Sequence, residues 1–351
     1  MPLRPAAANL PSAAAPASAR RHVAVHEKGH VGRFTADWDK MSDRTRARAA
    51  QWCRRRPRRI GADPAAAFIR NDDVAGLQTS DVAIDIDGEL LVATRAVRGV
   101  RVPLIGYSDV RYAQTMVSAR RYTASGAPAG PAARIFTSLT DPGLQYRGLS
   151  TAPPAAAFMS GGAALVVWET EDGVGPRGVF GRRLTANGRV DGLAFRVDGR
   201  ETPGANRPTV DADADGNVLI AWTQPHPQGP NSYSNEDVFV RRYDGAGRAG
   251  PIIKLDGDLA TSPDIDLAVS STGDAVLIWP STPSAFCCQP AQLTARRLDR
   301  SGQPTGASIL VAGNLVDEPQ VDMADDGSFV AAWGQGQFLN ERVFARRYSA
   351  P

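Results

Sequence analysis

The chain contains a long internal repeat, and no other feature of the sequence limits the possible folds as strongly. In four places a Gly precedes a Trp by six residues, and an Arg-Arg pair follows downstream. The markers are Gly162/Trp168, Gly216/Trp222, Gly273/Trp279 and Gly327/Trp333, with Arg pairs that begin at Arg182, Arg241, Arg296 and Arg346. A fifth copy keeps Gly88 and the pair at Arg120 but has Thr94 where Trp stands elsewhere. Units of this kind bury their apolar faces only against their neighbours, so we expect the repeated Trp to be a core residue. We expect one Arg of each pair to stack on a neighbouring Trp or to pair with an Asp of the turn.

Each unit contains four short segments with the composition of β-strands. In NVLIAW, residues 217–222, the side chains are apolar on both faces, which predicts a strand that is covered on both sides. Asp-Gly and x-x-Gly sequences follow the first and third segments, as tight hairpin turns require. We therefore predict an all-β fold, a β-propeller of four-stranded antiparallel blades packed face to face.

The repeat also resembles a known group of proteins. The pattern D-x-D-G-x-x-x-x-x-W, followed by V-x-x-R-R-Y-D-x-x-G, is similar to the repeats of bacterial propeller-type proteins. Those proteins are often secreted or surface-attached, and most have no known function. The resemblance covers nearly the whole chain, most strongly from residue 75 onward. It implies a propeller fold and a secreted or cell-surface location, but it implies no particular activity.

The first 72 residues decide the number of blades. Gly32 precedes Trp38 by six residues, and residues 55–68 align without gaps on residues 182–195. We expect a single propeller domain over 1–351. Its parts are an Ala/Pro-rich segment at 1–19 that is a candidate closing strand, a degenerate basic blade at 20–72, and regular blades at 73–351. Six blades is the preferred count. The alternative is five blades, with residues 66–72 closing the last one and a loose N-terminal region outside the ring.

Charge is distributed unevenly along the chain. Residues 1–64 contain 14 Lys/Arg against 5 Asp/Glu, although the whole chain has a net charge of only +3. The basic residues concentrate in Arg44–Arg59, which is either a polyanion-binding stretch or a solvated face. No apolar run is long enough for a membrane span, and the N-terminus lacks the apolar core of a secretory signal. The adjacent Cys287 and Cys288 are expected to be free thiols, and no Cys/His spacing is typical of zinc.

The segment VDADADGN, residues 210–217, begins like a calcium-binding loop. Asp211, Asp213 and Asp215 are spaced as the first three ligands would be, but the position that should supply a bidentate carboxylate is Trp222. The same place in the other units has a turn sequence without three carboxylates. We therefore predict a hairpin turn, with calcium binding by these three aspartates as a minor alternative and no other cofactor.

Candidate ligand-binding residues lie in the connections after the second and fourth strands, which vary in length and are expected on one face. Tyr146, Arg147, His226 and Tyr233 combine aromatic planes with polar groups, as sugar rings require. The candidate catalytic carboxylates on the same face are Glu169, Glu171, Asp317 and Glu318, because glycosidases need two facing acids.

Three functions remain open at the level of sequence. The preferred one is a non-catalytic, monomeric binding or interaction propeller with a glycan or protein ligand, because no compact catalytic motif appears. The first alternative is a carbohydrate-active hydrolase or lyase that uses paired carboxylates. The second is polyanion binding through Arg44–Arg59.

Overall fold

The computed structural model describes residues 77–102, 110–140, 152–170, 178–199, 204–225, 236–260, 264–282, 292–313, 316–335 and 342–351, and the backbone of 25–26 and 30–31. Within these ranges the chain forms antiparallel strands and one short 3-10 turn, η3 (Ser160–Gly162). The all-β prediction is therefore confirmed. None of the helical structure in these ranges is long and apolar enough to span a membrane.

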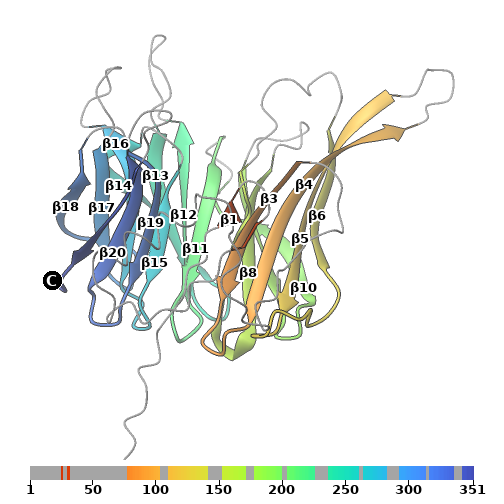
Figure 1. Ribbon diagram of the computed structural model, residues 1–351, viewed down its shortest axis with the longest axis horizontal. Coiled ribbons are helices and arrows are strands. Elements are labelled where there is room, and N and C mark those ends of the chain that lie inside the picture. The colour runs from red at the N-terminus through yellow and green to blue at the C-terminus, as the bar shows by residue number, and fades with distance from the viewer. Residues whose placement is uncertain are drawn as a thin grey trace, which may run out of the picture.

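The strands form five consecutive units, which we call blades 1 to 5 (Figure 1). Blade 1 contains β3 (Leu77–Ile84), β4 (Leu90–Val102), β5 (Val110–Tyr122) and β6 (Ala133–Thr140). Blade 2 contains β7 (Ala155–Phe158), β8 (Ala164–Thr170), β9 (Gly178–Leu184) and β10 (Val190–Arg196). Blade 3 contains β11 (Asn206–Ala212), β12 (Val218–Pro225), β13 (Glu236–Tyr243) and β14 (Ala249–Ala260). Blade 4 contains β15 (Asp266–Val269), β16 (Ala275–Thr282), β17 (Gln292–Leu298) and β18 (Pro304–Ala312), and blade 5 contains β19 (Val316–Met323), β20 (Phe329–Gln335) and β21 (Arg342–Tyr348).

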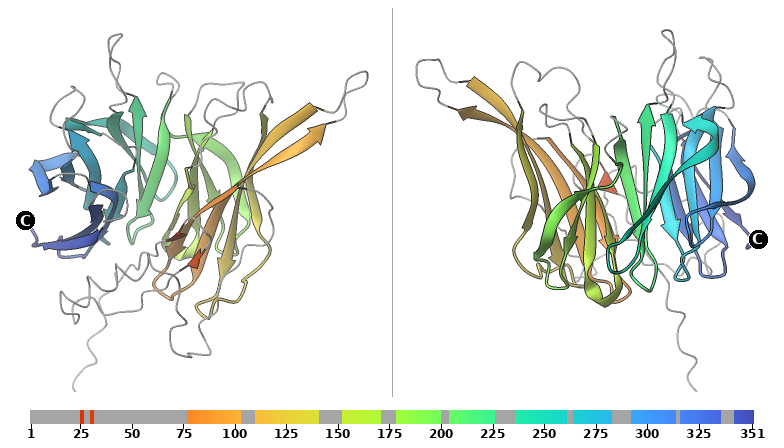
Figure 2. Two further views of the ribbon diagram at one scale, coloured as in Figure 1. Left: turned by 45° about the horizontal axis from the view of Figure 1, so that its top comes forward. Right: turned by 180° about the vertical axis from the view of Figure 1, so that it is seen from behind.

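The blades stand side by side around a common axis, as in a β-propeller. The first strand of each blade contacts the first strand of the next, in the order β3, β7, β11, β15 and β19. In each blade the following strands pair in sequence order away from the axis. Figure 2 shows that the blades form an arc, with blade 5 near the C-terminus and blade 1 at the other end. The last two residues of β14 also pair with β16, which joins blades 3 and 4.

Tight turns connect the first strand to the second and the third to the fourth. Gly88, Gly216, Gly273 and Gly327 occupy the first turn with φ between 81° and 94°, a conformation that Gly adopts without strain. In the first turn of blade 3, Gly216 donates its N–H to the carbonyl of Asp213. These turns lie together at one end of the blades, which we call the turn face; the opposite end is the loop face. The predicted role of the D-x-D-G sequence as a turn is confirmed.

The core lies between the blades. Trp222, Val218 and Ile220 face blade 2, whereas Leu219 and Ala221 face blade 4. We call these sides the leading and trailing faces of a blade. Trp168, Trp222 and Trp279 are each about 1% exposed, which confirms that the repeated Trp is a core residue. Truncating such a side chain typically costs about 3–5 kcal/mol.

In blades 1 to 4, the second Arg of the pair links its blade to the next one. Arg121 donates to the carbonyl of Gly162 at 2.7 Å, and Arg242 donates to that of Gly273 at 3.0 Å. Arg183 and Arg297 bind backbone carbonyls of blades 3 and 5 in the same way. The sequence suggested that one Arg of each pair contacts an Asp of the turn or a neighbouring Trp. Arg242 pairs with Asp213, as expected.

The stacking partner differs from the prediction. Arg121 lies 5.1 Å from the ring centre of Phe158, and Arg297 lies 4.8 Å from that of Phe329, each ring belonging to the next blade. In three pairs the first Arg lies over a Tyr of its own blade instead. A Trp cannot take this role because the repeated indoles fill the core.

Aspartates connect the innermost strands. The carboxylate of Asp81 accepts the N–H of Ala156 at 2.9 Å, and that of Asp211 accepts the N–H of Val269 at 2.7 Å. Asp266 does the same for Val321 at 2.7 Å. Each bond satisfies an inward-facing amide of the next blade that has no strand beside it.

Two short strands precede blade 1. In the hairpin of β1 (Val25–His26) and β2 (His30–Val31), Val25 lies opposite Val31 and His26 lies opposite His30. β1 lies against β3. Both candidates for the closing strand, 1–19 and 66–72, lie outside the described residues, and the blade count stays a prediction.

Candidate functional site

The described part of the loop face brings charged side chains from four blades together near the axis. Two of them belong to second strands, Arg95 in the middle of β4 and Glu169 near the end of β8, and two lie at or just before the beginnings of first strands. The predicted loop residues Tyr146, Arg147, Glu171, His226 and Tyr233 lie outside the described residues, so their placement stays a prediction. The site is therefore built from the strand ends.

Glu169, the penultimate residue of β8, connects three blades. Its side chain is 6% exposed, and its Oε1 lies 3.9 Å from Nη1 of Arg95 on blade 1, which is 3% exposed. Its Oε2 accepts the backbone N–H of Arg207 on blade 3 at 2.7 Å. Because the carboxylate is buried, removing one of these partners would leave an uncompensated charge.

Arg207 has an unusual backbone conformation. Its φ is 40°, in the left-handed region, and Pro208 follows it. Such a conformation costs of order 1–3 kcal/mol for a residue with a Cβ and persists where the surroundings impose it. In this conformation the N–H binds Glu169 while the guanidinium pairs with Asp264 of blade 4. The side chains of Arg207 and Asp264 are 40% and 34% exposed, so this pair is accessible to a ligand.

A second polar chain lies beside Arg207. The hydroxyl of Thr223 donates to Asn206 Oδ1 at 2.6 Å, and Asn206 Nδ2 donates to Glu236 Oε1 at 3.2 Å. The other oxygen of Glu236, Oε2, is buried and accepts no hydrogen bond from the described residues. Buried acceptors of this kind are normally satisfied, so a ligand hydroxyl or a water would suit this position.

Blade 5 repeats the strained position with the opposite charge. Glu318 has φ 46°, precedes Pro319 and is exposed, so it corresponds to Arg207 of blade 3. Asp317 precedes it in β19. The sequence suggested that Glu169 faces Asp317 and Glu318 across the ring as an acid pair. Glu169 binds Arg95 and Arg207 instead, and a catalytic role of these carboxylates stays a prediction.

The three aspartates of the calcium hypothesis have separate partners. Asp211 binds the N–H groups of Ala212 and Val269, and Asp213 binds Asn217 and Arg242. Asp215 contributes its backbone carbonyl to the hydroxyl of Ser160. Across the described residues, no group of three or more His, Cys, Asp or Glu side chains is arranged to hold a metal ion. Calcium binding here stays a prediction for a titration to test.

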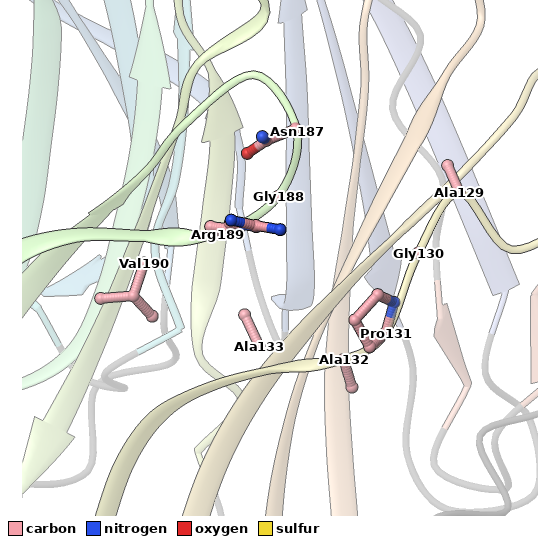
Figure 3. A pocket seen from close by; sticks show the side chains of 9 residues that line it. All are labelled: Ala129, Gly130, Pro131, Ala132, Ala133, Asn187, Gly188, Arg189 and Val190. Atoms are coloured by element: carbon pink, nitrogen blue, oxygen red, sulfur yellow. The ribbon is translucent and has the colours of Figure 1, made fainter.

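A shallow cleft lies on the turn face between blades 1 and 2 (Figure 3). Its volume is about 470 Å³, and its walls are the segments 129–133 and 187–190. Asn187 and Arg189 are the polar side chains among these residues, and the rest are small or apolar. The cleft therefore lacks the convergent charged groups of the loop face.

No protein-family model matches the chain, and no curated protein matches it. Among solved structures, it is similar to a protein of unknown function from Dyadobacter fermentans DSM 18053, with a TM-score of 0.47, 14% identity and coverage of 77% of this chain and 78% of the other. It is similar to an endo-arabinase from Bacteroides thetaiotaomicron VPI-5482, with a TM-score of 0.43, 8% identity and coverage of 80% and 97%. It is also similar to an α-L-arabinanase from Penicillium chrysogenum complexed with arabinobiose, with a TM-score of 0.42, 12% identity and coverage of 75% and 76%. These similarities are too weak to carry a conclusion about this chain.

Three residues of the site were missed from the sequence. Arg95, Arg207 and Asp264 lie outside the variable loops, where binding residues were expected. A signal was present, because Arg95 and Glu169 occupy equivalent positions after the repeated Trp or Thr94 and have opposite charges. Arg207 and Asp264 flank the starts of first strands, where the repeat carries no marker.

Proposed function

We propose that the protein is a non-catalytic binding propeller that takes a neutral carbohydrate at the loop face, over Arg207 and Asp264. The observation that carries the proposal is the chain of contacts from Arg95 through Glu169 and Arg207 to Asp264, buried at one end and accessible at the other. The two positive and two negative side chains of this chain of contacts balance one another, and together they offer both donors and acceptors.

Sugar hydroxyls match this chemistry because each one donates and accepts hydrogen bonds. The accessible Arg207–Asp264 pair provides N–H donors beside carboxylate acceptors, and Glu236 adds a buried acceptor oxygen nearby. The buried Arg95–Glu169 pair fixes the position of Arg207, because Glu169 accepts the backbone N–H of that residue. Preorganised groups of this kind favour affinity, because little ordering is needed when the ligand binds.

The test uses Arg207→Gly. Gly adopts φ 40° without strain and keeps the backbone N–H to Glu169, so the fold is retained while the guanidinium is lost. Affinity electrophoresis in gels that contain arabinan, xylan or a neutral glucan first identifies the polysaccharide that slows the wild-type protein. We expect Arg207→Gly to bind that polysaccharide with at least ten-fold lower affinity. The matched control is Glu318→Gly, which makes the same change in blade 5 and should keep binding. Unchanged affinity in Arg207→Gly would reject the proposal.

A glycoside hydrolase is the second candidate function. It is favoured by one observation: the carboxylates of Glu169 and Asp264, from blades 2 and 4, both contact Arg207. Glycoside hydrolysis requires two carboxyl groups about 5 to 10 Å apart, and the shared contact with Arg207 supports this arrangement. Arabinan belongs in the panel because two of the similar structures are an endo-arabinase and an α-L-arabinanase.

Incubating the protein with the same polysaccharides, and with heparin, separates the candidate functions. Newly released reducing ends that disappear in Glu169→Gln would establish the hydrolase in place of the binding protein. Retention only on a polyanion such as heparin, lost at physiological salt, would move the function to Arg44–Arg59, which lies outside the described residues.

A further inference from the structure

We propose that residues 20–72 form a sixth blade, seated between the trailing face of blade 5 and the leading face of blade 1. The inference goes beyond the proposed function, since it concerns how the ring is completed. It rests on three features of the described residues: the exposed side of blade 5, the buried side of blade 1 and the position of β1.

The trailing face of blade 5 is uncovered where its counterparts are not. In blade 4 the corresponding residues Val276, Ile278 and Leu293 are 0% exposed, because blade 5 packs on them. The equivalent residues of blade 5, by the position of Trp333 and of the Arg pair, are all partly exposed: Val330, Ala332 and Val343. Ala345 is exposed, whereas its counterpart Ala295 is 0% exposed. An apolar sheet face of this kind normally has a cover.

The leading face of blade 1 is covered already. Val82, Leu90, Val92 and Tyr122 form a buried cluster. They correspond to Val321, Phe329, Ala331 and Tyr348 of blade 5, which pack against blade 4. Blade 2 packs on the other side of blade 1, so a different part of the chain must cover this cluster.

β1 identifies that part of the chain. It lies against β3, the first strand of blade 1, as β3 lies against β7 and β11 lies against β15. β1 therefore occupies the inner position that the first strand of a preceding blade would take. The segment 20–72 has 53 residues, close to the 54 between Gly162 and Gly216 and the 57 between Gly216 and Gly273. That length suits a whole blade, whereas a single closing strand would use only residues 66–72.

The test is limited trypsin digestion of the full chain. The segment Arg44–Arg59 contains many cleavage sites, and inside a packed blade they are cut only when the protein opens. We expect this segment to be cut no faster than the Arg pairs of blades 2 to 4. Ala332→Arg, on the trailing face of blade 5, should accelerate cleavage there at least ten-fold. Leu193→Arg, at a position 87% exposed on β10, should leave it within two-fold.

Rapid cleavage of wild type at Arg44–Arg59 would overturn the proposal. If residues 66–72 were protected in the same digest, the result would favour the five-bladed ring. No effect of Ala332→Arg would also overturn it. Suppose instead that protection from trypsin rises with protein concentration and that light scattering shows a dimer. The uncovered face of blade 5 would then be assigned to a second copy of the chain, and the sixth blade would be rejected. If Ala332→Arg does not fold, thiol labelling replaces it. With Cys53, Cys287 and Cys288 changed to Ser, Val343→Cys should react at least ten-fold more slowly than Leu193→Cys, and equal rates would reject the sixth blade.

Discussion

The two ends of the blades use charged side chains in opposite ways. On the turn face, Asp213 accepts hydrogen bonds from Asn217 N and Asn217 Nδ2, each at 2.8 Å, and pairs with Arg242. The two bonds to Asn217 lie within the turn, and the pair with Arg242 joins the turn to β13. On the loop face, the Arg207–Asp264 pair bridges two blades at 40% and 34% exposure. Charge therefore fixes the chain at one end and remains accessible to ligands at the other.

Backbone strain separates the two ends as well. The positive φ angles of the first turns fall on Gly, which adopts them freely, whereas Arg207 and Glu318 adopt them on the loop face with a side chain attached. Strain at residues with charged side chains is typical of positions that serve binding. The comparison predicts that turn-face changes alter stability and leave binding unchanged, whereas changes at Arg207 alter binding.

The largest effect is expected for Asp213→Ala on the turn face. Asp213 is 4% exposed, and its loss leaves the guanidinium of Arg242 without its carboxylate. We expect about 3 kcal/mol less free energy of unfolding, measured in urea, because a broken buried pair leaves an uncompensated charge. Carbohydrate affinity should not change. Asp215→Ala is the control, since that exposed residue acts through its backbone carbonyl. A loss of affinity in Asp213→Ala would break the division between the two faces.

Wild type and Asp215→Ala can also be titrated with calcium. A rise in the melting temperature of wild type that is absent in Asp215→Ala would show that the D-x-D-x-D-G segment binds the ion.

A smaller effect of the opposite sign is expected for Glu318→Gly on the loop face. Gly removes the cost of φ 46°, so the free energy of unfolding should rise by about 1 kcal/mol, less the extra flexibility that Gly gives to the unfolded chain. Thermal unfolding measures the difference. A marked fall in stability would mean that the carboxylate of Glu318 makes contacts worth more than the strain, and the comparison with Arg207 would then need revision.

The smallest effect concerns pH. A hydrogen bond from Ser301 lowers the pKa of Asp299 below 3.8, and one from Ser328 does the same for the pKa of Asp326. Because the folded state favours their ionised forms, these groups stabilise the protein above pH 3.8, and the contribution is lost as the pH falls through their folded-state pKa. We expect Asp299→Asn to flatten the fall in melting temperature below pH 4.

Asp198 should behave in the opposite way. Burial raises its pKa above 3.8, although Arg196 partly offsets this. The folded state thus binds its proton more tightly, and the stability that the protonated form provides is lost as the pH rises through the folded-state pKa. Asp198→Asn should reduce the decline in melting temperature just above pH 4. If melting temperature changed with pH identically in wild type, Asp299→Asn and Asp198→Asn, these two pH predictions would be wrong.

The sequence predicted what the repeat marks and little else. Gly216 and Trp222 predicted the turn and the core because the Gly recurs in all five regular units and the Trp in four of them. The opposite charges of Arg95 and Glu169 at equivalent repeat positions were a signal, but the sequence does not show that the two residues meet, because they lie 74 positions apart and come together only when blades 1 and 2 pack. The positive φ of Arg207 was also beyond reach, since a residue before Pro normally adopts an extended conformation. Binding residues in a repeat protein are those that differ between units, and a repeat pattern does not mark them.

The bond from the second Arg in blades 1 to 4 ends on a backbone carbonyl of the next blade. In all four cases the acceptor is a Gly, and a Cβ at Gly273 would lie 2.6 Å from Nη2 of Arg242. A unit copied along the chain therefore brings both halves of the link, the Arg for the blade after it and the Gly for the blade before it. The loops on the opposite face lie outside this link, and their sequences differ in length and chemistry from unit to unit.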